Sequence, residues 1–261
     1  MEFGLDQVQR MYRDQLRAYV EDEVIGENAA WDDDENFPTD VWADLCELGV
    51  VGLSIPEEYG GDGLDPITAG VVYEELGRGD VGFATLVLAE NLVNHLLAEY
   101  GSERHREIAT RNANGDVHLA FALTEPDHGS DAQAIETTAE LDGDSWVLTG
   151  EKTAITGATT ADHVLTYARE TDSNGIRAFL VPTAADGVEW ERHLGHAPWH
   201  PRQYHETAVF DGRMWVLEGW DGESNRNDVW HSPNGIDWTE LPDTPWPPRH
   251  AASVCVFDDA L

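Results

Sequence analysis

The stretch "FALTEPDHGSD", residues 121–131, decides how the rest of the chain is interpreted. It places two hydroxyl side chains, Thr124 and Ser130, and the glycine Gly129 in a short loop directly after an apolar run. Hydroxyls can donate hydrogen bonds, and a residue without a Cβ lets a ligand approach the backbone. An acidic turn without a ligand would use the same residues. The loop alone leaves both interpretations open, so the surrounding sequence has to separate them.

The composition indicates a folded but strongly acidic protein. The chain has 261 residues, which is enough for one large domain or two ordinary ones. Hydrophobic residues make up 41% of it, too many for a disordered acidic tail, so we expect a buried core. Against 51 Asp and Glu there are 15 Lys and Arg, and Lys152 is the only lysine. The net charge of −36 argues against nucleic acid or an anionic membrane surface as a partner.

The charge also predicts the environment of the protein. Self-repulsion of this size destabilises a compact fold in dilute buffer, but at about 1 M salt the Debye length falls to roughly 3 Å. We therefore expect a halophilic protein from an acidic proteome, with an ordinary acidic protein as the alternative. The charged N-terminus lacks the apolar core of a signal peptide, and no stretch reaches the roughly 18 apolar residues of a membrane span. Cys46 and Cys255 show no motif spacing, so a cytoplasmic location with free thiols is expected.

Residues 1–116 are predicted to form a helical domain, because apolar residues recur there at three- and four-residue spacing. We expect Thr39 or Asp40 to cap one of the helices at its N-terminus, and Gly101 to end another. Ser102 is expected to start a short helix. The other predicted helices cover residues 5–24, 39–48, 66–80 and 81–102.

The hydrophobic period changes after Gly115. Short segments rich in Val, Thr and Ile follow, separated by turns, and "LDGDS" at 141–145 predicts a hairpin. We therefore expect an antiparallel, barrel-like β domain over residues 117–190. Its predicted strands are "VHLAFALTE", "AIETTAEL", "SWVLTGEKTAIT", "ADHVLTYARE" and "GIRAFLVPT".

The last part of the chain, residues 191–261, shows an internal repeat. From Trp199 onward it carries six of the ten tryptophans, and "APWHPRQYHETAVFDGRM" at 197–214 aligns without a gap to "TPWPPRHAASVCVFDDAL" at 244–261. The offset from 197 to 244 is 47 positions, a period typical of a propeller blade or another repeat array. The pairs Asp211-Gly212 and Asn234-Gly235 predict hairpins within the repeat.

Three motifs together resemble the acyl-CoA dehydrogenase family over about residues 5–190. They are "LSIPEEYGGDGLD" at 53–65, "FALTEPDHGSD" at 121–131 and "GEKTAITGA" at 150–158, in this order. The resemblance implies an N-terminal helical domain over 1–116 and an incomplete middle β domain over 117–190. It also implies FAD as cofactor, α,β-dehydrogenation of acyl-CoA thioesters as the reaction, and an electron-transfer flavoprotein as the electron acceptor.

The resemblance also implies the residues of the site. Thr124 would bond the pyrimidine edge of the flavin, Ser130 would lie near the flavin or the CoA substrate, and Thr156 would approach the N5 edge. Ala154 stands where many members carry an aromatic residue, which removes stacking area. Asp127 and His128 occupy positions that are often small in the family. The full set of cofactor-binding candidates is Phe121, Ala122, Leu123, Thr124, Gly129, Ser130, Ala154, Ile155 and Thr156, and Ser130 is also the substrate-binding candidate.

The family takes its catalytic carboxylate from a C-terminal helical domain, and nothing after residue 190 resembles that domain. Glu218, Glu223 and Glu240 belong to the repeat and cannot inherit the role, so no catalytic base is named. We therefore expect little or no dehydrogenase activity from this chain alone. The family homotetramer is also doubtful here.

Residues 191–261 resemble about one and a half kelch repeats of a β-propeller, fused to the dehydrogenase part or cut short within the reading frame. The alternative function is a kelch-type protein-binding fragment attached to a vestigial dehydrogenase half. The nearby histidines His193, His196 and His200 do not predict a metal site, because Gly195 and Pro198 interrupt any shared helical face.

Overall fold

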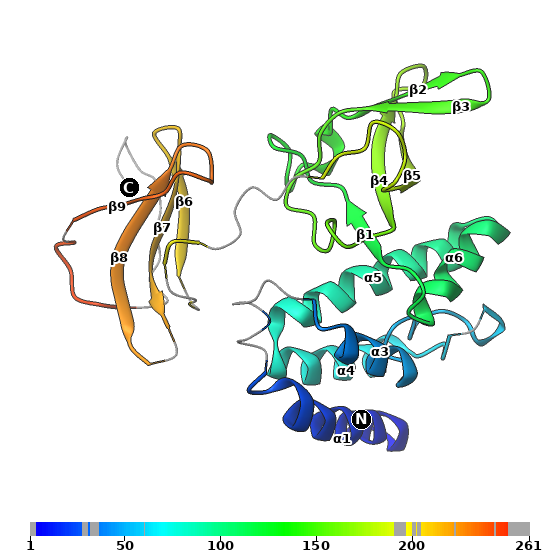
Figure 1. The fold of residues 1–261 in the computed structure, drawn as a ribbon, viewed down its shortest axis with the longest axis horizontal. Coiled ribbons are helices and arrows are strands. Elements are labelled where there is room, and N and C mark those ends of the chain that lie inside the picture. The colour runs from blue at the N-terminus through cyan, green and yellow to red at the C-terminus, as the bar shows by residue number, and fades with distance from the viewer. Residues whose placement is uncertain are drawn as a thin grey trace. The chain divides into compact units, whose positions relative to one another are not determined.

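The computed structural model describes residues 4–27, 31, 37–59, 61–190, 197–199, 202, 205–221, 223–242 and 244–249. The chain divides into two compact units, Met1–Trp190 and Glu191–Leu261. Figure 1 shows helices and one sheet in the first unit and a second sheet in the other. All the residues predicted to bind a cofactor lie in the first unit.

The first unit begins with a set of helices close to the predicted ones. Aspartates start three of them: the side chains of Asp6, Asp65 and Asp80 accept hydrogen bonds from backbone amides of the first turns. The prediction that Thr39 or Asp40 caps a helix was wrong, because both lie inside α3 and the N-cap position is Pro38, without a side-chain cap. The helices are α1 (Gln7–Tyr19) with the π-helical turn η1 (Val20–Val24), α3 (Thr39–Glu47), the 3-10 turn η2 (Glu57–Tyr59), α4 (Pro66–Gly79), α5 (Val81–Tyr100) and α6 (Glu103–Ala113).

Helix α5 lies at the centre of the helical part. It contributes Phe83 and Val87 to one core cluster with α1, α3 and α4, and Val93 and Leu97 to a second cluster with α6 and the sheet. By length and a mean hydropathy of 1.4, α5 passes a test for a membrane-crossing helix, so the sequence-based statement that no such stretch exists was too strict. Half of this 18-residue apolar stretch of α5 is buried inside the fold, and the stretch includes the buried Glu90, as expected for a core helix.

The sheet of the first unit is mixed, which corrects the antiparallel prediction. Strand β4 pairs in parallel with β1 and with β2, and antiparallel with β5, while β2 and β3 form the predicted hairpin. A parallel pair needs a crossover connection, and residues 123–162 provide it between β1 and β4. The described strands form an open sheet that does not close into a barrel. They are β1 (Leu119–Ala122), β2 (Thr138–Asp142), β3 (Ser145–Thr149), β4 (His163–Glu170) and β5 (Ile176–Pro182), with the 3-10 turn η3 (Ala132–Ala134) before β2.

Strand β1 connects the helices to the candidate site. Its side chains alternate between the two faces of the sheet. Leu119 belongs to the cluster with α5 and α6, and Phe121 packs against that cluster. Ala120 and Ala122 face the other way, into a cluster that Ile155 joins. The small alanines therefore face the segment that follows β3.

The second unit contains one antiparallel sheet of four strands among its described residues. The Asp211-Gly212 hairpin is confirmed, since both turn residues have positive φ and connect paired strands. Asn234 lies in a longer loop, where its side-chain oxygen accepts hydrogen bonds from the amides of Ile236 and Asp237. The strands are β6 (Glu206–Phe210), β7 (Arg213–Trp220), β8 (Asn225–Ser232) and β9 (Thr239–Glu240).

This sheet has the strand number of one propeller blade, but a propeller needs about four to eight such sheets around an axis. The described part of residues 191–261 contains one sheet, so no propeller is present in it. Most of the second repeat copy, 250–261, lies outside the described residues, as do His193, His196 and His200. The kelch resemblance therefore stays a prediction.

Candidate functional site

The loop after β1 is a tight turn with a defined backbone. Glu125 and His128 exchange two backbone hydrogen bonds, with N···O distances of 3.0 and 3.1 Å. Pro126 and Asp127 form the exposed tip of the turn. Thr124 is half-buried before the turn, and Ser130 is exposed after it.

The segment after β3 lies directly beside this loop. The amide of Thr153 donates to the carbonyl oxygen of Thr124 at 3.0 Å. Ile155 packs against the cluster that contains Ala120 and Ala122. A Cβ on Gly157 would lie 2.7 Å from Leu86 Cδ1, so the end of the segment lies close against α5. The structure therefore brings together the two chain segments that were predicted to form the walls of one site.

A buried ion pair connects the same two segments. The Lys152 ammonium donates to Glu125 Oε1 at 2.8 Å and to the Leu123 carbonyl oxygen at 3.0 Å. The side chains of Lys152 and Glu125 are each 5% exposed. The Glu125 carboxylate also accepts from the amides of Glu136 and Thr137, at 2.6 and 2.9 Å, and from the Thr137 hydroxyl at 2.5 Å.

These donors decide the ionisation of Glu125. Burial alone raises the pKa of a carboxyl group, but the hydrogen bonds from Glu136, Lys152 and Thr137 outweigh it and lower the pKa of Glu125 to about 2. Sequence reasoning missed this pair. The signal that could have found it is composition: the only lysine of a chain of net charge −36 stands inside one of the three motifs.

The predicted cofactor residues offer free hydrogen-bond donors. Within the described residues, the hydroxyls of Thr124, Ser130 and Thr156 make no hydrogen bond to another protein group. No atom lies within 4 Å of the position that a Cβ on Gly129 would take, so the backbone there can be approached. A flavin ring carries carbonyl and ring-nitrogen acceptors, so this donor set fits FAD.

The structure joins only part of the predicted set. The Thr153–Thr124 hydrogen bond places the 154–156 segment next to Thr124, and Phe121 and Ala122 lead directly into the same loop. Among the described residues, no hydrogen bond connects Ser130 to Thr124 or to Thr156. Flavin binding by each residue therefore stays a prediction. Ala154 has φ of +53°, a left-handed conformation that is uncommon for a residue with a Cβ.

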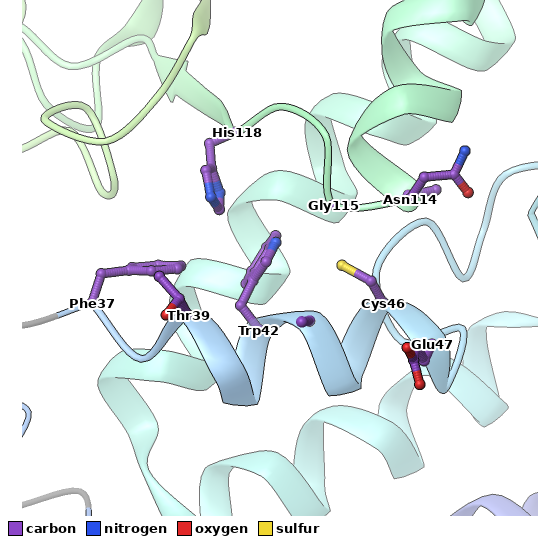
Figure 2. Close-up of a pocket in the computed structure, with 10 residues that line it drawn as sticks. Phe37, Thr39, Trp42, Cys46, Glu47, Asn114, Gly115 and His118 are labelled. Atoms are coloured by element: carbon purple, nitrogen blue, oxygen red, sulfur yellow. The ribbon is translucent and has the colours of Figure 1, made fainter.

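A separate pocket of about 370 Å³ lies in the helical part, between α3 and the turn that leads into β1 (Figure 2). None of the predicted site residues lines it. The His118 ring forms one wall, 4.9 Å from the Trp42 ring and 5.0 Å from the Phe37 ring between centroids. Figure 2 shows the Cys46 sulfur facing the same space. Burial first, and then the charge of Glu90, raise the pKa of the Cys46 thiol to about 12, so it stays protonated.

Behind this pocket lies a second buried carboxylate. Glu90 Oε1 is 3.1 Å from His118 Nδ1, and the carboxylate accepts from the amide of Leu119 at 3.2 Å and from the side chain of Asn112. The pKa of Glu90 is raised, because burial outweighs its hydrogen bonds. The pKa of His118 is also raised, chiefly by its hydrogen bond to Glu90. This network ties α5 and α6 to the start of β1.

Comparisons with known proteins agree with the motifs. Residues 6–112 match the acyl-CoA dehydrogenase N-terminal domain, and residues 120–212 match the acyl-CoA dehydrogenase middle domain. The second match runs past residue 190 and includes β6. The chain is 35% identical over 189 residues to the mitochondrial short-chain specific acyl-CoA dehydrogenase of Rattus norvegicus, covering 70% of this chain and 46% of that protein. It thus spans about half the length of the curated relatives it matches.

Two solved structures resemble the fold. A glutaryl-CoA dehydrogenase from Mycobacterium smegmatis in complex with FADH2 aligns with a TM-score of 0.65 and 28% identity, over 91% of this chain and 54% of that one. A chain of the electron transferring flavoprotein structure from Acidaminococcus fermentans aligns with a TM-score of 0.67 and 30% identity, over 75% and 54%. With two domain matches that together span most of residues 6–212, the chain belongs to the acyl-CoA dehydrogenase family and carries its N-terminal and middle domains.

Proposed function

We propose that this chain is the FAD-binding part of an oxidoreductase that dehydrogenates acyl-CoA thioesters at the α and β carbons. One observation carries the proposal: the Thr153–Thr124 hydrogen bond joins the two motif segments that the family uses around its flavin. The free hydroxyls of Thr124, Ser130 and Thr156 support it, because they suit the acceptors of an isoalloxazine ring. The match to a relative solved with FADH2 supports FAD as the cofactor.

The candidate residues would contact different parts of the flavin and the substrate. Thr124 and the neighbouring backbone of Phe121–Leu123 would hold one edge of the ring, and Ala154, Ile155 and Thr156 would hold the other. Gly129 would let the flavin approach the backbone, and Ser130 would lie near the flavin or the CoA substrate. When bound, FAD supplies the hydride acceptor for the β carbon, while the acidity of the α proton comes from the thioester. Hydrogen bonds to the thioester carbonyl oxygen would stabilise the charge that develops there.

FAD binding by the full 261-residue chain tests the proposal. We expect the purified protein to retain yellow flavin, or to bind added FAD in a fluorescence titration. Thr124→Val, which removes one hydroxyl at nearly constant volume, should weaken binding. The same change at the exposed Thr171, in the turn after β4, is the matched control and should leave affinity unchanged. A colourless chain that ignores FAD contradicts the proposed function.

Partners and activity are also part of the proposal. We propose acyl-CoA as the substrate class and an electron-transfer flavoprotein as the acceptor, since the family acts on such substrates. The family homotetramer stays doubtful. No described residue is assigned as the catalytic base, so we expect low dehydrogenase turnover from this chain alone. A kelch-type binding role for residues 191–261 remains the alternative prediction.

The environment of the protein is a further proposal. With a net charge of −36, the folded state should gain stability as KCl screens the repulsion between acidic side chains. A cytoplasmic location with high salt fits this composition. Thermal unfolding measured against KCl tests the salt dependence, and a midpoint that stays constant or falls contradicts it.

A further inference from the structure

The Lys152 side chain contacts the predicted flavin loop on both sides of Thr124. Its ammonium donates to the carbonyl oxygen of the preceding residue, Leu123, and to the carboxylate of the following residue, Glu125. The next residue along the chain, Thr153, donates its amide to the carbonyl oxygen of Thr124 itself. The dipeptide Lys152-Thr153 therefore binds three consecutive residues of the 121–131 segment, which are Leu123, Thr124 and Glu125.

Glu125 extends this connection to a third element. Its carboxylate accepts from the amides of Glu136 and Thr137, which lead into β2. Since β2 pairs with β3, and β3 leads into Lys152, the contacts form a closed chain from the loop through the β2–β3 hairpin and back. A closed set of contacts allows less movement between segments than a single hydrogen bond would.

The Lys152–Glu125 pair is not suited to bind an anion, because the Lys152 ammonium already donates to two protein oxygens. Lys152 and Glu125 neutralise each other, and both are nearly inaccessible to solvent. A buried ammonium with a carboxylate and a carbonyl as partners has little capacity left for a phosphate or a substrate carboxylate. Lys152 therefore acts on the site through Thr124 rather than by direct contact.

We propose that Lys152, paired with Glu125, is a positioning residue for FAD binding: it fixes the spacing between the 121–131 and 150–156 segments. This inference rests on the proposed function. Arginine should reproduce this spacing only in part, because a planar guanidinium keeps the positive charge but is larger and presents its donors in a fixed fork. The ion pair is expected to affect flavin affinity beyond its effect on folding stability.

The first measurement needs no flavin. Hydrogen exchange in the FAD-free chain should be faster at the Thr153 amide in Lys152→Met than in the unchanged protein, because the two segments are no longer held at a fixed spacing. Arg177→Met is the matched control: it breaks the Arg177–Glu170 pair between β5 and β4, whose arginine is exposed and which lies outside the two segments. Unchanged exchange at Thr153 in Lys152→Met overturns the inference, whatever the chain does with FAD.

The second measurement is FAD affinity in KCl at a concentration where every variant is folded. Lys152→Met should weaken binding roughly tenfold to a hundredfold and shift the visible spectrum of the bound flavin, since small displacements of positioning groups have effects of this order. Lys152→Arg should be intermediate, and Arg177→Met should be unchanged. Equal affinity and spectrum in Lys152→Met overturn the positioning role while the proposed function stands. If the unchanged chain binds no FAD, the proposed function fails and the inference fails with it.

A double variant separates positioning from stability. Lys152→Met with Glu125→Gln leaves no unpaired buried charge. The Glu136 and Thr137 amides donate to different oxygens of the carboxylate, so the single amide oxygen of the glutamine keeps an acceptor for one of them. The double variant should therefore recover part of the stability relative to Lys152→Met but not FAD affinity. Recovery of both together would show that the pair only stabilises the fold, which contradicts the inference.

Discussion

Two buried glutamates in the first unit, Glu125 and Glu90, are surrounded in opposite ways. Glu125 faces an ammonium and three further donors, and its pKa is lowered to about 2. Glu90 faces the side chain of Asn112, one backbone amide and the His118 ring, and its pKa is raised because burial dominates. Both side chains are nearly inaccessible, at 5% and 1% exposure.

The difference shows that burial alone does not decide the charge of a carboxyl group. A lysine within 2.8 Å and several N–H and O–H donors are enough to keep Glu125 ionised. In a chain with a single lysine, that lysine lies where two segments of the predicted cofactor site meet. The Glu90 network instead connects α5 and α6 to the start of β1, and no lysine or arginine side chain donates to it within the described residues.

The largest effect is expected when Lys152 is removed. Lys152→Met leaves the Glu125 carboxylate buried without its cation and should lower the free energy of unfolding by about 3–5 kcal/mol. Urea denaturation at fixed KCl measures this value. Arg177→Met is the control, with an expected change of about 0–1 kcal/mol because the Arg177 side chain is 55% exposed to solvent. Similar losses in the two variants would contradict the distinction between the buried and the exposed pair.

Acid should reduce the contribution of Glu125 in a defined range. Because its folded pKa is lowered from 4.5 to about 2, its stabilisation is present above pH 4.5 and is lost as the pH falls toward 2. Glu125→Gln should therefore be less stable than the unchanged chain at pH 6, and this difference should shrink below pH 4.5. Urea titrations of both proteins at several pH values provide the comparison. A difference that is constant with pH would show that Glu125 does not titrate as described.

Much of the fold could be predicted because local patterns decide it. The apolar spacing of α4 and α5, the Asp-Gly turn between β6 and β7 and the β2–β3 hairpin all depend on residues close in sequence. The parallel pairing of β1 with β4 could not be predicted, because strand composition does not distinguish parallel from antiparallel partners. Pairing across a long crossover depends on the whole fold.

The candidate site shows the same division. The hydroxyls of Thr124, Ser130 and Thr156 could be named because they stand inside motifs that resemble a family. The Lys152–Glu125 pair was missed, although both residues belong to those motifs. Their contact joins positions 27 residues apart in sequence, and only the folded chain reveals that both side chains point into the same buried space.

The Glu90 network should respond less than the Glu125 pair. Glu90→Gln keeps an acceptor and removes a charge that burial already disfavours, so we expect a loss of about 1–2 kcal/mol. The pKa of His118 should also fall toward 6.5, because its hydrogen bond to Glu90 raises it. NMR titration of the His118 ring measures the pKa directly.

The raised pKa of His118 decides how its contribution to stability depends on pH. A histidine with a raised folded pKa contributes stability that is complete below pH 6.5 and is lost as the pH rises through the folded pKa. The difference in free energy of unfolding between the unchanged chain and Glu90→Gln should therefore decrease as the pH rises above 6.5. A His118 pKa that is the same in both proteins would contradict the assigned pairing.

The smallest expected effect is a difference in salt dependence between the buried Lys152–Glu125 pair and the more exposed Arg177–Glu170 pair. KCl at about 2 M reduces the Debye length to a few ångströms, which screens exposed charges but leaves pairs without solvent access almost unchanged. The destabilisation caused by Lys152→Met should therefore be the same at low and high KCl, while the small effect of Arg177→Met should shrink, because the Arg177 side chain is 55% exposed. Both comparisons use urea denaturation at two KCl concentrations. If salt removed the Lys152→Met effect as well, the ammonium would have to be accessible to solvent, and the closed connection between the two segments could not exist.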